Sequence, residues 1–123
     1  MNKIQIKGYF KNYGMDTQIH YNETGHLIGN SITFDKDNTN IKIKFKNDRI
    51  IFIKNDENSI LEHEFIQNKQ TSSKYYLKQE NININIPIFT TRIKKEENKL
   101  KIEYYLDDDK SNNILDIEYE VLI

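Results

Sequence analysis

The segment Asn81-Ile82-Asn83-Ile84-Asn85-Ile86 alternates polar and apolar residues without interruption. Successive side chains of a β-strand point to opposite faces of the sheet, so this alternation predicts a strand with one buried and one solvated face. Alternating runs recur about ten times, from residues 3–7 to residues 116–121. The chain is therefore predicted to be all-β.

Short turns connect the predicted strands. Asn47-Asp48 is a two-residue hairpin turn of a favoured type, and Asn68-Lys69 predicts a second hairpin. Because the connections are short, strands that follow one another in the sequence should pair antiparallel. Such a sheet must roll up to bury its apolar face, and closure removes its unpaired edges. We predict a single antiparallel up-and-down β-barrel of about 8 to 10 strands, with residues 1–123 as one domain.

Two positions interrupt this pattern. Thr24-Gly25 separates a predicted strand at residues 17–23 from the next, near residues 26–34. Pro87 has no amide hydrogen to donate, so it marks a sheet edge or a bulge. No segment repeats apolar residues with helical spacing over three turns, and any helix is predicted to be short and to lie in residues 10–16 or 88–97.

The composition bounds the class of protein. The chain has 123 residues, a mass of 14.8 kDa, a net charge of -1 and no cysteine. This length suits one hydrophobic core, and the lack of cysteine excludes disulfides and thiolate metal ligands. Residues 1–7 alternate like a strand and do not resemble a signal peptide, and no apolar stretch reaches about 18 residues. We expect a cytoplasmic protein without a membrane segment.

Several segments also resemble a known protein family in their order and spacing. They are Thr24-Gly25, Phe65, Tyr75, Thr90 to Ile93, Leu100-Lys-Ile-Glu-Tyr104 and Ile117-Glu-Tyr119. The chain resembles the small, uncharacterised bacterial proteins typified by YwiB. This resemblance implies a lipocalin-like (calycin-like) β-barrel. The family has no established activity, so the resemblance implies no particular chemistry.

Alternation also predicts which side chains face the barrel interior. The predicted inward set is Ile4, Ile6, Ile19, Tyr21, Ile43, Phe45, Ile51, Ile53, Leu61, Phe65, Ile84, Ile86, Ile102, Tyr104, Leu115, Ile117 and Tyr119. A barrel of eight or more strands either encloses a small ligand or is filled by its own side chains, and the strand count does not decide between the two. A hollow interior with this lining would suit a small apolar molecule.

The leading hypothesis is a non-enzymatic barrel that binds a small apolar ligand in its interior. The candidate ligand-binding residues are Tyr21, His63, Phe65, Tyr104 and Tyr119. His63 alternates with Leu61 and Phe65, so it should point inward. Two interpretations of His63 remain open: a histidine hydrogen-bonded to a neighbour in the core or at the barrel mouth, or a ligand contact.

An alternative hypothesis places the function on the outer surface. Every second residue of the predicted strand 41–46 is lysine, which gives a lysine-rich face of Lys42, Lys44 and Lys46. This face would suit a protein or nucleic-acid partner, especially with exposed aromatic residues such as Phe52 and Tyr105 nearby. Lysine also keeps sheet faces soluble, so the sequence favours the interior ligand over a nucleic acid.

No catalytic or metal-binding motif accounts for the remaining polar residues. Residues 107–118 have the ligand spacing of an EF-hand loop, but Asn112 replaces the required glycine and the flanking residues alternate like strands. A solvated hairpin loop is therefore predicted there. His20, His26 and His63 lack metal-ligand spacing, and no serine lies in a nucleophile motif. We predict no catalytic residue, metal or cofactor, and hence no enzyme.

Overall fold

The computed structural model describes residues 2–14, 16–106 and 109–122, which form ten β-strands and no helix. The strands are β1 (Asn2–Asn12), β2 (Thr17–Ile28), β3 (Ser31–Lys36), β4 (Thr39–Phe45), β5 (Ile50–Asn55), β6 (Ser59–Phe65), β7 (Gln70–Leu77), β8 (Ile82–Glu96), β9 (Lys99–Leu106) and β10 (Asp109–Val121). The all-β prediction is confirmed. The short helices are wrong, because residues 10–12 belong to β1 and residues 88–96 to β8.

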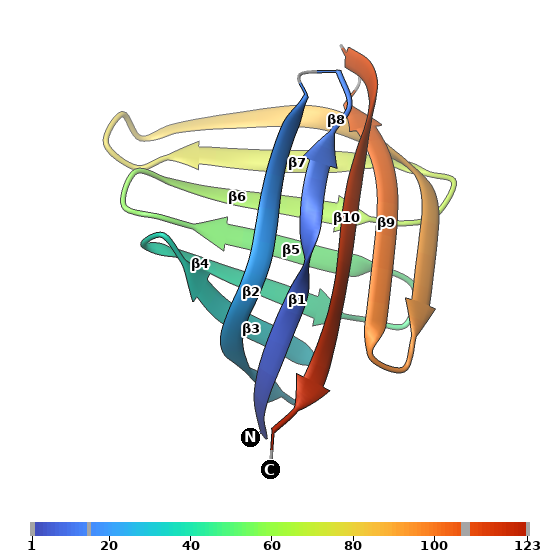
Figure 1. Cartoon of the computed structure of the whole chain (residues 1–123). Helices are drawn as coiled ribbons and strands as arrows, with labels where there is room; N and C mark the ends of the chain where they lie inside the picture. Colours follow the sequence, from blue (N-terminus) through green and yellow to red (C-terminus); the bar gives the residue numbers. More distant parts are fainter. Residues whose placement is uncertain (1, 15, 107–108, 123) are drawn as a thin grey trace.

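The strands form a closed barrel in which each strand pairs antiparallel with its neighbours in the sequence. β10 returns to pair with β1, where Ile4 lies opposite Val121, and the Leu122 amide donates a 2.8 Å hydrogen bond to the Lys3 carbonyl. In Figure 1, β1, β2, β9 and β10 cross the strands β4 to β7 at a steep angle, and β8 bends from one wall into the other. The predicted up-and-down barrel is confirmed.

Two strands are paired on both sides over only part of their length. β8 pairs with β7 along residues 82–89, but its pairing with β9 begins at Ile88. Residues 17–24 of β2 pair with β1, whereas pairing with β3 begins at Gly25. In the described part of the chain, residues 82–87 and 17–24 therefore have a strand on one side only. Of the edge or bulge predicted at Pro87, the structure shows an edge.

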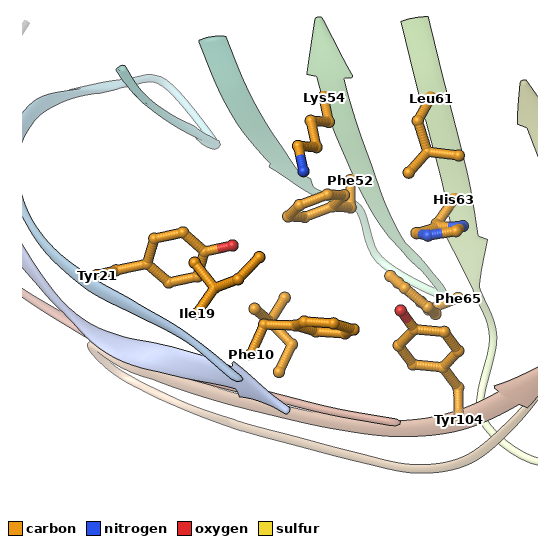
Figure 2. Close-up of a pocket in the computed structure, with 10 residues that line it drawn as sticks. Phe10, Ile19, Tyr21, Phe52, Lys54, Leu61, His63, Phe65 and Tyr104 are labelled. Atoms are coloured by element: carbon orange, nitrogen blue, oxygen red, sulfur yellow. The ribbon is translucent and has the colours of Figure 1, made fainter. Parts of the chain in front are cut away.

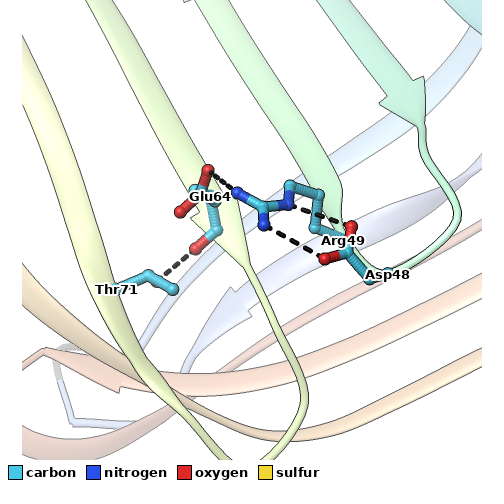
Figure 3. Close-up of polar contacts among 4 residues, drawn as sticks. All are labelled: Asp48, Arg49, Glu64 and Thr71. Atoms are coloured by element: carbon cyan, nitrogen blue, oxygen red, sulfur yellow. Dashed lines mark hydrogen bonds and ion pairs between the residues drawn. The ribbon is translucent and has the colours of Figure 1, made fainter.

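A polar cluster holds the turn between β4 and β5, at the predicted Asn47-Asp48 position. Arg49, the first residue after the turn, donates hydrogen bonds of 3.1 Å from Nε and Nη2 to the Asp48 carboxylate, and one of 2.8 Å from Nη1 to Glu64 Oε2 (Figure 3). The Thr71 hydroxyl donates to the Glu64 backbone carbonyl. These contacts connect the turn to β6 and β7.

The predicted break at Thr24-Gly25 is wrong. β2 continues to Ile28, and its turn into β3 contains Gly29, whose φ is +57°. Gly25 is buried in the strand, where a Cβ atom would lie 2.3 Å from the Thr33 carbonyl oxygen. Glycine is needed here because β2 and β3 approach closely, which is a different requirement from a turn.

The inward face of β5 also differs from the prediction. Ile50 and Phe52 are buried, at 5% and 8% exposure, whereas Ile51 and Ile53 lie on the opposite face and are half-buried. The segment is apolar on both faces, so alternation alone does not select the inner one. Ile84 lies opposite Tyr75 in the β7–β8 pair, yet it is 41% exposed because it lies on the stretch of β8 that has one partner strand.

Much of the interior is filled by aliphatic side chains. We call seven of them, all exposed by 2% or less, the aliphatic cluster: Ile4, Ile6, Ile32, Ile43, Leu100, Ile102 and Ile117. They come from both walls of the barrel. Burial of this apolar surface is the main contribution to the stability of the fold.

Candidate ligand-binding cavity

The rest of the interior contains a cavity of about 90 Å³. β5 and β6 supply one side, and β1, β2, β9 and β10 supply the other (Figure 2). The lining residues are Phe10, Ile19, Tyr21, Phe52, Lys54, Leu61, His63, Phe65, Tyr104 and Leu115. None of them belongs to the aliphatic cluster. The cavity is therefore lined mainly by aromatic rings, with four side chains that carry a polar group.

The register of β5 and β6 brings half of this lining together. Directly opposite residues of an antiparallel pair place their side chains on the same face. Phe52 lies opposite His63, and Lys54 lies opposite Leu61. Phe65, two residues beyond His63, points to the same interior.

The aromatic rings form a compact group around His63. Its imidazole centroid lies 6.0 Å from the Phe52 ring in a stacked arrangement, and 5.5 Å from each of Phe65 and Tyr104. The Phe65 and Tyr104 centroids are 4.9 Å apart. These distances are within the favourable range for aromatic pairs, so the rings hold one another in place and give the cavity a fixed wall.

His63 is a buried polar residue of the lining, with 8% exposure. Its Nδ1 atom has no hydrogen-bond partner among the described residues. Burial lowers the pKa of His63 to about 4, and the positive charge of Lys54 adds to this effect. The imidazole is therefore neutral at pH 7, and it offers a polar atom that the described protein does not satisfy.

Two tyrosine hydroxyls complete the neutral polar groups. Burial raises the pKa of Tyr21 to about 12 and raises that of Tyr104 further. Both phenols therefore keep their protons at pH 7 and can donate hydrogen bonds. Neither hydroxyl is bonded to a described residue.

Lys54 is the one charged residue in the described lining. Its side chain is half-buried and extends into the cavity beside Phe52 (Figure 2). It forms no ion pair with a described residue. The barrel thus carries a positive charge on its inner face, next to aromatic rings.

The structure brings four of the five predicted site residues together. Tyr21, His63, Phe65 and Tyr104 line the same cavity. Tyr119 lies outside it, and its hydroxyl donates a 3.2 Å hydrogen bond to the Glu97 carbonyl. His63 points inward, as alternation predicted.

Sequence reasoning missed three residues of the lining, namely Phe10, Phe52 and Lys54. For Phe52 and Lys54, the turn before β5 indicates in the sequence which face is inner. A two-residue turn at Asn47-Asp48 places Phe45 opposite Ile50. Every second residue of β5 then faces inward, which gives Ile50, Phe52 and Lys54.

The lysine-rich face carries charges of both signs across the neighbouring strands. On the same face, the residues opposite Lys42 are Ile53 of β5 and then Glu62 of β6, and those opposite Lys44 are Ile51 and then Glu64. Glu62 lies opposite Lys74 of β7 in turn, and Glu64 forms an ion pair with Arg49. Phe52, one of the two aromatic residues expected beside the lysines, is buried in the cavity instead.

Among the described residues, no group of histidine, aspartate and glutamate side chains is placed to hold a metal ion. In the EF-hand-like segment, Asp107 and Asp108 lie outside the described residues, and residues 113–118 pair with β9 as part of a strand. The described part of the chain contains no helix that is long and apolar enough to cross a membrane.

Comparison with known proteins gives a likeness of fold. The YwiB protein from Bacillus subtilis matches with a TM-score of 0.68 and 16% sequence identity, over 98% of this chain and 91% of that chain. No protein-family model and no curated protein matches the sequence. The resemblance to YwiB read from the sequence is thus confirmed as a shared β-barrel fold. At this identity it carries no chemistry over.

Proposed function

We propose that this protein is a non-enzymatic β-barrel that binds a small, largely apolar molecule in the cavity. The observation that carries the proposal is the pairing of an apolar aromatic wall with polar groups that lack protein partners. The fully buried Nδ1 atom of His63 has none among the described residues, and the hydroxyls of Tyr21 and Tyr104, which are not fully buried, make no hydrogen bond to one. Buried polar groups normally have partners, and a bound molecule would supply them.

The volume bounds the size of this molecule. The cavity of about 90 Å³ exceeds the roughly 10–15 Å³ that one water needs, but it is below the roughly 300–1,000 Å³ of a pocket for drug-sized ligands. We therefore propose a ligand with few non-hydrogen atoms. Ile19 and Tyr21 lie on the stretch of β2 that has one partner strand, and we place the entrance beside this stretch.

The chemistry of the lining supports binding over catalysis. No carboxylate, serine or threonine is among the described lining residues. With a pKa of about 4, the neutral His63 is a weak base at pH 7, far from the value that general base catalysis favours. The polar groups are suited to orient a bound molecule, and we propose no reaction step for them.

Binding can be tested by methyl NMR with 1-hexanol as the probe. We expect saturable shifts in the methyl signals of Ile19, Leu61 and Leu115, and none in those of Ile51, which lies outside the cavity. Replacement Leu61→Phe should fill the cavity and weaken binding.

The matched control is Ile60→Phe, the preceding residue on β6, which faces away from the cavity. This variant should bind hexanol like the original protein. Absence of any saturable shift, or equal losses in both variants, would contradict the proposal. Circular dichroism of the two variants establishes that both remain folded.

The surface alternative is supported less well. Phe52, one of the two aromatic residues expected beside the lysines, is buried in the cavity, and Glu62 interrupts the positive charges of Lys42 and Lys74 across the sheet. Binding to heparin at low salt, lost when Lys42 and Lys44 are replaced by glutamine, would favour it over the interior ligand.

A further inference from the structure

The cavity has an excess of hydrogen-bond donors. Lys54 supplies an ammonium group, and the protonated phenols of Tyr21 and Tyr104 supply two hydroxyls. The described lining contains no carboxylate that would accept from them. A complementary ligand would therefore carry acceptor oxygens.

Lys54 also has no contacting ion pair with a described residue, although Asp56 interacts with its charge from a greater distance. Asp56, two residues further along the chain, accepts hydrogen bonds of 2.8 Å from the amides of Asn58 and Ser59. A half-buried ammonium without a contacting counter-ion is costly, and a bound anion would relieve that cost.

We infer that the ligand is a monocarboxylate, with its carboxylate on the Lys54 ammonium and its apolar part against Phe52, His63 and Phe65. This inference rests on the proposed function and specifies its ligand class. One cation matches one negative charge, and the aromatic wall excludes a second charged group from the apolar end. Figure 2 shows the Lys54 side chain beside the ring of Phe52 at one end of the cavity lining. The carboxylate of the ligand and its apolar part would therefore lie next to each other.

The test compares hexanoate with 1-hexanol, which has the same chain and no charge, by titration calorimetry at pH 7. We expect hexanoate to bind at least about tenfold more tightly, since a hydrogen bond to a charged group adds roughly that much. In Lys54→Met, which keeps the apolar stem, the preference should disappear while hexanol still binds. High salt should weaken hexanoate binding selectively.

The matched control is Lys44→Met, which removes a positive charge from the outer face of the neighbouring strand. It should retain the preference for hexanoate. Equal affinities of hexanoate and hexanol, or the same loss in both lysine variants, would overturn the assignment of a carboxylate and leave the apolar cavity standing. Failure of both probes to bind would overturn the proposed function together with this inference.

Discussion

The aliphatic cluster and the cavity wall lie on the same inner face of one barrel, yet they differ in packing. Side chains of the aliphatic cluster are exposed by 2% or less, whereas four of the five aromatic side chains around the polar groups, Tyr21, Phe52, His63 and Tyr104, are exposed by 5–8% and Phe65 by 1%. Branched isoleucine and leucine side chains interlock until little space remains. Rigid rings with polar tips cannot pack in this way without a partner for each tip. Strand count thus sets the size of the barrel, and residue type decides which part of it stays hollow.

The largest effect should come from opening a gap in the aliphatic cluster. Ile102 is 0% exposed, and Ile102→Ala should lower the free energy of unfolding by about 4 kcal/mol, through lost burial and a new cavity. Leu61→Ala, at the half-buried cavity wall, should cost only about 1.5 kcal/mol. Urea unfolding measures both, and similar losses would mean that the two regions are equally well packed.

The next effect is a dependence of stability on pH. It comes from the cavity wall, because the aliphatic cluster has no titratable group. The pKa of His63 is lowered to about 4 in the folded protein, against an ordinary value of 6.5. Between these values the unfolded chain binds more protons, so stability should fall as the pH falls from 6.5 to 4, by about 3 kcal/mol. Above pH 6.5 this contribution is fully present.

The control for this effect is His63→Phe, which removes the titrating group and retains a ring. Unfolding measured from pH 7 to pH 4 should show a shallower decline in the variant. His20 and His26 are present in both proteins and cancel in the difference. Parallel profiles would show that His63 titrates normally.

A smaller effect should come from Thr90, a polar residue that is 0% exposed on β8. Its Oγ1 atom has no hydrogen-bond partner among the described residues. Because Val has nearly the same shape, Thr90→Val should raise the free energy of unfolding by about 1 kcal/mol. A decrease, measured by urea unfolding, would indicate that the hydroxyl is satisfied in solution.

The smallest effect should come from Arg49, outside both regions. Its hydrogen bonds to the carboxylate of Asp48 lower the pKa of that group, but the pair is exposed to solvent. Arg49→Met should reduce thermal stability less than Ile102→Ala or Leu61→Ala, and 1 M salt should abolish most of the difference. A loss that persists in high salt would point to packing of the arginine stem instead.

The sequence predicts most of the fold, because local signals decide most of it. Alternation identifies the strands, and Asn47-Asp48 identifies a turn that the structure contains. The predicted separation of two strands at Gly25 is wrong, since the sequence does not distinguish a glycine that permits close strand approach from one between two strands. That distinction depends on the opposite strand, which lies eight or more residues away along the chain.

The candidate site was predicted in part for a related reason. Tyr21, His63 and Tyr104 lie in strands with a clear inner face, and all three reach the cavity. Lys54 lies in a strand that is apolar on both faces. Its pairing register with β4 decides which side chains point inward, and residue type does not. A lysine on an inner face is the opposite of the usual expectation, and such local exceptions concentrate at functional sites.

Residues 82–87 of β8, which have a partner strand on one side only, have a consequence for aggregation. Their exposed isoleucines and free backbone groups are the kind of template onto which another chain can add, the first step of fibril growth. Pro87 interrupts this template, because it offers no amide to an incoming strand. A chain with Pro87→Val should therefore seed thioflavin-positive aggregates sooner under agitation, even where its native barrel is no less stable.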